Sequence, residues 1–232
     1  MVNVLGIVGG LGPESTIDYY RRLIAVYRKR IADDSYPAIV ITSLDVSKGL
    51  RLVAAQEYGE LADYLVQALD QLARAGATVG LISANTPHIV FDQVQSRSEL
   101  PLISIVEAAC AAAQQQGMSK VALLGTRFTM QAHFYPEVFS RVGIALVVPT
   151  DDEQSFIHDK YVNELIPGIF LDATRERLLG IIRRMQKEDS VQGVLLAGTE
   201  LPLILRQQDV PEVPLLDTTV IHVEAAVTRL LS

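Results

Sequence analysis

The chain has 232 residues, of which 49% are hydrophobic, and a formal net charge of −7. This length allows one large or two small domains with a sizeable core. The negative charge predicts no nucleic-acid partner, and apolar stretches shorter than the roughly 20 residues of a membrane span predict no membrane partner. One cysteine excludes an intramolecular disulfide framework, and four scattered histidines form no metal-ligand pattern. With no basic leader at the N-terminus, we expect a cytoplasmic protein.

Short apolar runs alternate with amphipathic segments along the whole chain. The expected strands span residues 2–8, 38–43, 78–83, 102–105, 120–124, 145–148, 191–196 and 214–216. The expected helices span residues 15–31, 61–74, 90–94, 107–116, 134–141, 151–165, 174–186 and 218–231. The segment 45–56, which carries Lys48 and Arg51, is expected to be a loop. This alternation predicts an α/β fold with parallel sheets that are covered by helices on both sides.

The sequence contains an internal repeat, in which similar segments recur at a nearly constant spacing. Gly80–Thr86 and Gly193–Thr199 are short apolar runs that end in Ala-x-Thr, 113 positions apart. Ile7–Gly9 matches Leu123–Gly125 at an offset of 116 positions. We interpret the chain as two similar α/β domains related by a pseudo-twofold axis, with a site in the cleft between them. The expected domains comprise residues 1–98 plus 217–232 and residues 99–216.

Four turns follow the ends of expected strands, where ligands bind in parallel α/β sheets. They are Gly9–Gly12, Ala84–Thr86, Gly125–Thr129 and Ala197–Thr199. The first is not G-x-G-x-x-G and has no P-loop lysine, which favours a small anion or a merely tight turn over a nucleotide. The short polar residues of the other turns can cap helices, or they can bind a carboxylate, which hydroxyls and helix N-termini suit.

The motifs at these turns are Gly9-Gly10-Leu11-Gly12-Pro13, Asn85-Thr86, Leu124-Gly125-Thr126-Arg127-Phe128-Thr129-Met130 and Gly198-Thr199-Glu200-Leu201-Pro202. In order and spacing, across nearly the whole chain, they resemble the aspartate/glutamate racemase family. The resemblance implies two α/β domains, an amino-acid substrate, no cofactor, and two catalytic cysteines. The expected substrate-binding residues are Gly10, Leu11, Lys48, Arg51, Asn85, Thr86, Thr126, Thr129, Gly198 and Thr199.

The sequence departs from the family pattern where the resemblance places the two catalytic cysteines. Ala84 and Ala197 occupy these positions. Inversion of an α-carbon needs acid/base groups on opposite faces, and a methyl group can neither take nor give a proton. Ile166 stands where many members of the family carry a substrate-binding lysine. Lys48 or Arg51 remains available for the distal carboxylate of a substrate.

Few other side chains suit acid/base chemistry. His88, four residues beyond Ala84, is either a lone acid/base group near the cleft or, as we favour, a hydrogen-bonded support of the turn. Glu200 is expected to stabilise a helix end rather than to catalyse a reaction. Cys110 lies within a predicted helix and is expected to be a small buried core residue.

Three functions therefore remain open. The chain is a racemase whose two cysteines were replaced to trap a substrate, or a divergent member that binds or transforms a small carboxylate by other chemistry, or a regulatory relative without a ligand. In each case racemisation by this chain is expected to be absent or severely impaired. The expected partner is a small amino acid or dicarboxylate, and a homodimer is left open as the assembly.

Overall fold

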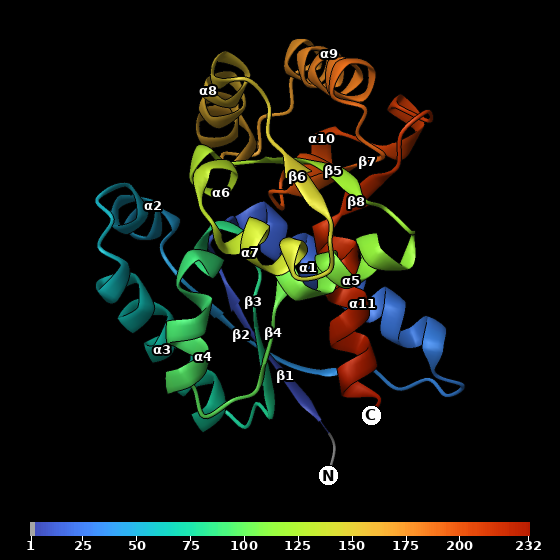
Figure 1. The fold of residues 1–232 in the computed structure, drawn as a ribbon. Helices are drawn as coiled ribbons and strands as arrows, with labels where there is room; N and C mark the ends of the chain where they lie inside the picture. Colours follow the sequence, from blue (N-terminus) through green and yellow to red (C-terminus); the bar gives the residue numbers. More distant parts are fainter. Residues whose placement is uncertain (1–2) are drawn as a thin grey trace. The chain divides into compact units, whose positions relative to one another are not determined.

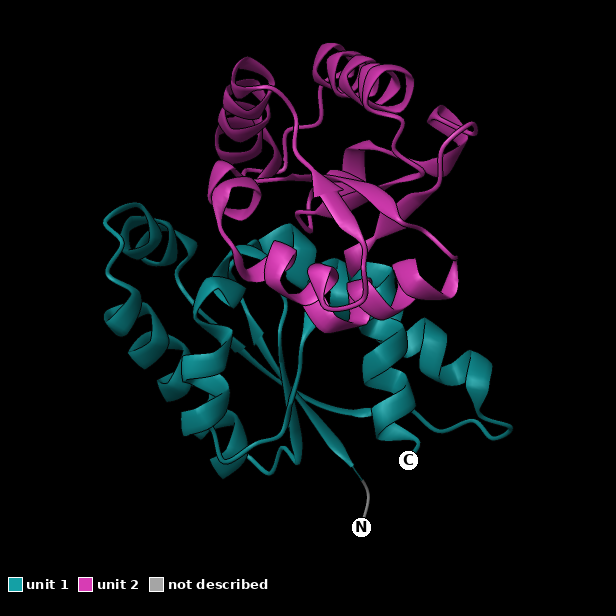
Figure 2. Cartoon of the chain, in the orientation of Figure 1, with its two compact units in different colours: residues 1–105, 219–232 teal, residues 106–218 magenta. Residues whose placement is uncertain are grey.

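The computed structural model describes residues 3–232, so Val2 of the first expected strand lies outside the described residues. The chain divides into two compact units (Figure 2). The first comprises the described residues up to Ile105 together with Thr219–Ser232, and the second comprises Val106–Thr218. Each unit has its own four-stranded parallel sheet. The expected fold of two similar α/β halves is confirmed.

The first unit is built on a sheet with the strand order β2-β1-β3-β4. Its elements are β1 (Val4–Gly9), α1 (Pro13–Arg30), β2 (Ala38–Ser43), α2 (Val46–Ala54), α3 (Tyr58–Arg74), β3 (Val79–Ile82), the 3₁₀ helix η1 (Thr86–Val90), α4 (Phe91–Arg97), β4 (Leu102–Ile103) and the C-terminal α11 (Thr218–Leu230). Figure 1 shows α3 and α4 on one side of this sheet and α1 and α11 on the other.

The second unit is built on a sheet with the order β6-β5-β7-β8. Its elements are α5 (Ile105–Gln115), β5 (Lys120–Gly125), α6 (Arg127–Gln131), α7 (Phe134–Ser140), β6 (Ala145–Val147), α8 (Asp151–Lys160), the π-helical segment η2 (Tyr161–Leu165), α9 (Asp172–Asp189), β7 (Gly193–Ala197), α10 (Leu201–Ile204), the 3₁₀ helix η3 (Gln207–Asp209) and β8 (Leu215–Asp217). In Figure 1, α8 and α9 lie on one side of the sheet and α5 and α7 on the other.

The same strand order in both sheets explains why the segments Gly80–Thr86 and Gly193–Thr199 resemble each other in sequence. β3 and β7 each lie third in their sheet, and each pairs in parallel with the first strand of its own unit, β1 or β5. Every residue of both strands is buried. A strand that is covered on both faces must be apolar throughout, which is why these segments read as continuous hydrophobic runs.

Each unit has a hydrophobic core of its own. In the first, strand residues such as Leu5 and Leu81 pack against Tyr19 of α1 and Val223 of α11. In the second, Leu124 and Leu196 pack against the buried faces of α8 and α9. The helices supply these contacts because their apolar residues recur every three or four positions.

Two differences from the sequence expectation concern the segment 45–56 and the boundary of the first unit. The segment 45–56 is mostly the helix α2 rather than a loop. Asp45 caps this helix by accepting a hydrogen bond from the Ser47 amide at 2.8 Å, and Leu52 and Val53 are buried. β4 pairs with β3, so the first unit extends to Ile105, whereas the expected domain ended at residue 98. None of the helices within residues 3–232 is both long and apolar enough to cross a membrane.

Candidate functional site

The first strand-end turn connects β1 to α1. Gly10 has a φ of 79°, a left-handed conformation that favours glycine, and a Cβ at this position would overlap the backbone of Leu44. The Gly10 amide donates to Thr16 Oγ1 at 2.9 Å, and Pro13 begins α1. Leu11 lies next to Gly49 of α2. The turn is therefore held close to the end of β2 by backbone contact that only glycine permits.

The second turn of this unit carries Ala84, directly after β3. The Ser83 hydroxyl donates to the Val8 carbonyl at 3.1 Å, and the Ser15 hydroxyl donates to the Ser83 carbonyl at 3.1 Å. Ala84 is 4% exposed and Asn85 is 3% exposed. These hydrogen bonds join the turn to β1 and to the first turn of α1. The expected binding residues Gly10, Asn85 and Thr86 thus lie at one edge of one sheet.

His88 is buried in η1 and uses both ring nitrogens on the backbone. Nδ1 lies 2.9 Å from the Ala84 carbonyl, and the Ile105 amide donates to Nε2 at 3.3 Å. An Nε2 that accepts is unprotonated, so Nδ1 carries the proton and donates to Ala84. Burial, with a smaller effect of neighbouring His222, lowers the His88 pKa to about 3. This geometry favours the supporting role over acid/base chemistry.

Lys48 and Arg51 follow β2 on the helix α2. Lys48 Nζ lies 4.2 Å from the centre of the Tyr64 ring, and the Tyr64 hydroxyl accepts a hydrogen bond from the Asp45 amide at 2.8 Å. Both basic side chains are exposed and lie one helical turn apart. Both side chains can therefore bind one anion at the exposed face of α2.

In the second unit, the turn after β5 is capped by its own threonines. Thr126 Oγ1 accepts a hydrogen bond from the Thr129 amide at 3.2 Å, and the two hydroxyls lie 3.2 Å apart. Both side chains are buried. Gly125 pairs with Ala197 across β5 and β7, which brings this turn beside the end of β7. The alternative that these threonines act as helix caps is correct for Thr126.

The turn after β7 contains a buried carboxylate that we expected only to stabilise a helix end. Tyr161 donates a hydrogen bond to Glu200 Oε2, and Thr199 Oγ1 donates to the same oxygen at 3.1 Å. Glu200 is 1% exposed, and Ala197 at the strand end is 0% exposed. Burial, followed by the charge of Glu200, raises the pKa of Tyr161 well above its usual value, so the phenol keeps its proton.

Tyr161 is the residue that sequence reasoning missed. It reaches the turn from η2, 36 positions before Ala197 in the chain, and a Cβ on Gly198 would overlap its ring. The only sequence signal is the glycine itself, which permits the close approach of an aromatic ring. Ile166 packs against the hydrophobic core of this unit, and Cys110 is buried as expected.

The sequence around these turns matches a known protein family. The family model described as Asp/Glu/Hydantoin racemase matches residues 8–226 of the chain. The chain belongs to this racemase family. All four strand-end turns, from Gly9 to Thr199, lie within the matched region.

Solved structures support the assignment over the whole chain. A candidate Asp/Glu racemase from Yersinia pestis is 32% identical with a TM-score of 0.88, covering 99% of this chain and 100% of that one. An aspartate racemase homologue from Pyrococcus horikoshii OT3 is 33% identical with a TM-score of 0.83, covering 100% of both chains. The broad specificity amino-acid racemase RacX of Bacillus subtilis (strain 168) is 22% identical over 234 residues, or 99% of each chain.

Proposed function

We propose that this member of the racemase family binds a small amino acid or dicarboxylate at its strand-end turns and racemises it poorly or not at all. The observation that carries the proposal is the pair Ala84 and Ala197. Each is a buried methyl group at the end of the third strand of its sheet, where the resemblance places a catalytic thiol. A thiolate can carry a proton to or from an α-carbon, and a methyl group cannot.

Binding is supported by the groups that surround each methyl. The buried Asn85 side chain and the hydroxyls of Thr126 and Thr199 lie at the carboxyl ends of parallel strands. In open α/β sheets ligands bind at this edge, and amide and hydroxyl groups satisfy the oxygens of a carboxylate. The names of the relatives RacX and the aspartate racemase homologue favour an amino acid as the ligand. That both turns meet one ligand stays a prediction.

A second candidate is a natural member that binds or transforms a related carboxylate by other chemistry. It is favoured by Ile166, which packs into the core of the second unit where the resemblance places a lysine. A chain altered only to trap a substrate would not need this change. The ligand of such a divergent member need not be aspartate or glutamate.

A thermal-shift screen of both enantiomers of aspartate and glutamate, together with dicarboxylates, tests the binding. A ligand that binds only the folded chain raises the Tm in a concentration-dependent way. Deuterium incorporation at the α-carbon, measured in D₂O on any ligand that binds, tests the chemistry. Stabilisation without exchange supports the proposal. Rapid inversion by the parent chain would contradict it, and the absence of any stabilising ligand would favour the regulatory alternative.

A further inference from the structure

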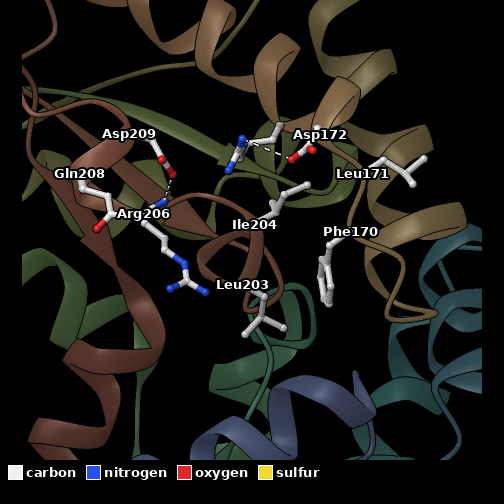
Figure 3. Close-up of a pocket in the computed structure, with 9 residues that line it drawn as sticks. Phe170, Leu171, Asp172, Leu203, Ile204, Arg206, Gln208 and Asp209 are labelled. Atoms are coloured by element: carbon white, nitrogen blue, oxygen red, sulfur yellow. Dashed lines mark hydrogen bonds and ion pairs between the residues drawn. The ribbon is translucent and has the colours of Figure 1, made fainter.

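A pocket of about 250 Å³ lies entirely within the second unit (Figure 3). It is lined by the beginning of α9 with the two residues before it, by α10, and by the segment 206–209. It contains none of the residues that we assign to the strand-end turns. Its volume lies below the range of roughly 300–1,000 Å³ that is usual for drug-sized ligands, so it suits a smaller molecule.

One wall of the pocket is apolar and incompletely covered. Phe170 is 42% exposed and Leu171 is 47% exposed, whereas Ile204 is 6% exposed. Figure 3 shows Phe170 on one side and Arg206 on the other, with Ile204 and Leu203 between them. Covering exposed apolar side chains removes apolar surface from water, which stabilises a complex. A ligand with a short apolar group would gain this energy here.

The opposite side of the pocket presents a guanidinium group. Arg206 is exposed, and no ion pair joins its side chain to any carboxylate within residues 3–232. Its backbone amide, rather than its side chain, is the group that Asp209 Oδ2 binds, at 2.9 Å. The positive charge of Arg206 is thus left for a partner from outside the chain.

A second guanidinium in the pocket is poorly satisfied. Arg175 Nη2 lies 3.2 Å from Asp172 Oδ1 and 3.6 Å from Glu176 Oε1, and both carboxylates are largely exposed. Exposed pairs of this kind contribute little. Arg175 Nε is buried and has no hydrogen-bond acceptor among residues 3–232. A buried donor without an acceptor is unfavourable, so a carboxylate that turned this guanidinium toward the pocket would satisfy it.

We propose that this pocket binds a small monocarboxylate that carries a short apolar group. The carboxylate pairs with the guanidinium of Arg206 and takes a second donor from Arg175. The apolar group covers Phe170 and Leu203. Of the two lining aspartates, Asp172 has a side chain that is 91% exposed, so solvent and salt screen its charge, and Asp209 Oδ2 accepts a hydrogen bond from the Arg206 amide.

Calorimetric titration of the full chain with hexanoate tests the proposal. Hexanamide has the same apolar group without the charge, and acetate has the charge without the apolar group. We expect hexanoate to bind at least about tenfold more tightly than either. Arg206→Gln should weaken hexanoate binding about tenfold or more, because it removes a charged hydrogen-bond donor. Leu203→Ser should also weaken it.

Two control variants distinguish binding in this pocket from binding elsewhere on the chain. Arg141→Gln changes an exposed arginine of the same unit outside the pocket, and it should leave hexanoate binding unchanged. Thr199→Val, at the strand-end turn, should leave it unchanged as well. No saturable binding by the parent, or equal binding by the parent and the folded Arg206→Gln variant, would overturn the proposal. Weakening by Thr199→Val alone would assign hexanoate to the strand-end turn and also overturn it.

Discussion

Tyr161 and Glu200 are joined by a hydrogen bond beneath the turn that ends β7, and both side chains are buried. Tyr161 belongs to the π-helical segment η2, and Glu200 lies directly before α10. The pair therefore fastens the segment after α8 to the turn that carries Gly198 and Thr199. Single-turn π-helical segments occur frequently at functional sites.

Loss of the Tyr161 hydroxyl should destabilise the second unit. Tyr161→Phe keeps the ring against Gly198 but removes a donor from the buried Glu200 carboxylate, which should lower the free energy of unfolding by about 1–3 kcal/mol. Urea unfolding measures the change. A double-mutant cycle with Glu200→Gln should give a non-zero coupling energy, and additive effects would contradict a direct interaction.

Gly198 should not tolerate a side chain. A Cβ here would overlap the buried Tyr161 ring, so Gly198→Ala should cost about 1–3 kcal/mol of stability. Gly180→Ala is the matched control, since this glycine lies within α9 and a Cβ there meets nothing within 4 Å. The control should be stabilising by up to about 1 kcal/mol, because alanine is the better helix former. Equal effects of the two changes on the Tm would contradict the close packing.

Thr86→Val should weaken ligand binding while leaving the fold intact. The change keeps the shape of the side chain and removes a hydroxyl at the end of β3. For any ligand that stabilises the parent, we expect the Kd to rise about tenfold, the effect of one hydrogen bond to a charged group. Thr228→Val, on the exposed face of α11, is the control and should bind like the parent. Unchanged binding by Thr86→Val would remove this residue from the site.

Cysteines at positions 84 and 197 should restore the proton transfer that the two methyl groups cannot perform. Ala84→Cys or Ala197→Cys alone should allow at most exchange of the α-proton with solvent at one face of the substrate. The double variant should be the first that racemises, provided that the pocket still fits the substrate. Deuterium incorporation and optical rotation measure both reactions. An inactive double variant would indicate a pocket that has diverged beyond the thiols, as Ile166 suggests.

The free energy of unfolding of the first unit should decrease as the pH falls below 6.5, the usual pKa of histidine. Burial lowers the pKa of His88 to about 3 and that of His222 to about 4. Between pH 6.5 and these values, the unfolded chain binds protons that the folded chain does not. These residues therefore contribute stability above pH 6.5 that is lost as the pH falls toward 4 and 3.

The slope of the unfolding free energy against pH measures this effect. Each histidine can add up to about 1.4 kcal/mol per pH unit within that window. His222 is placed by Tyr19, whose hydroxyl lies 2.9 Å from Nδ1, and by the Ile103 carbonyl, 2.9 Å from Nε2. A His88→Gln/His222→Gln variant should have a smaller slope than the parent. An unchanged slope would mean that other groups cause the acid sensitivity.

Much of the fold follows from local patterns in the sequence. The apolar runs that became β3 and β7, and the constant spacing between them, were sufficient to predict two similar α/β halves. This works because strands that are buried on both faces must be apolar throughout and helices must show a 3.6-residue period. The same reasoning predicted that these turns follow the ends of strands. The role of Ala84 and Ala197 rests on the family resemblance and stays a prediction. It failed for α2, a helix of only 9 residues that was expected to be a loop.

Other features depended on tertiary structure because they join residues distant in the chain. The approach of Tyr161 to Gly198 and Glu200 follows from where η2 packs beside β7, which no local pattern encodes. The hydrogen bond that His88 Nε2 accepts depends on the position of Ile105, 17 residues further along the chain. The pocket at Arg206 forms where the beginning of α9, α10 and the segment 206–209 come together. Sequence periodicity determines which residues are buried, whereas packing between elements determines which polar groups meet.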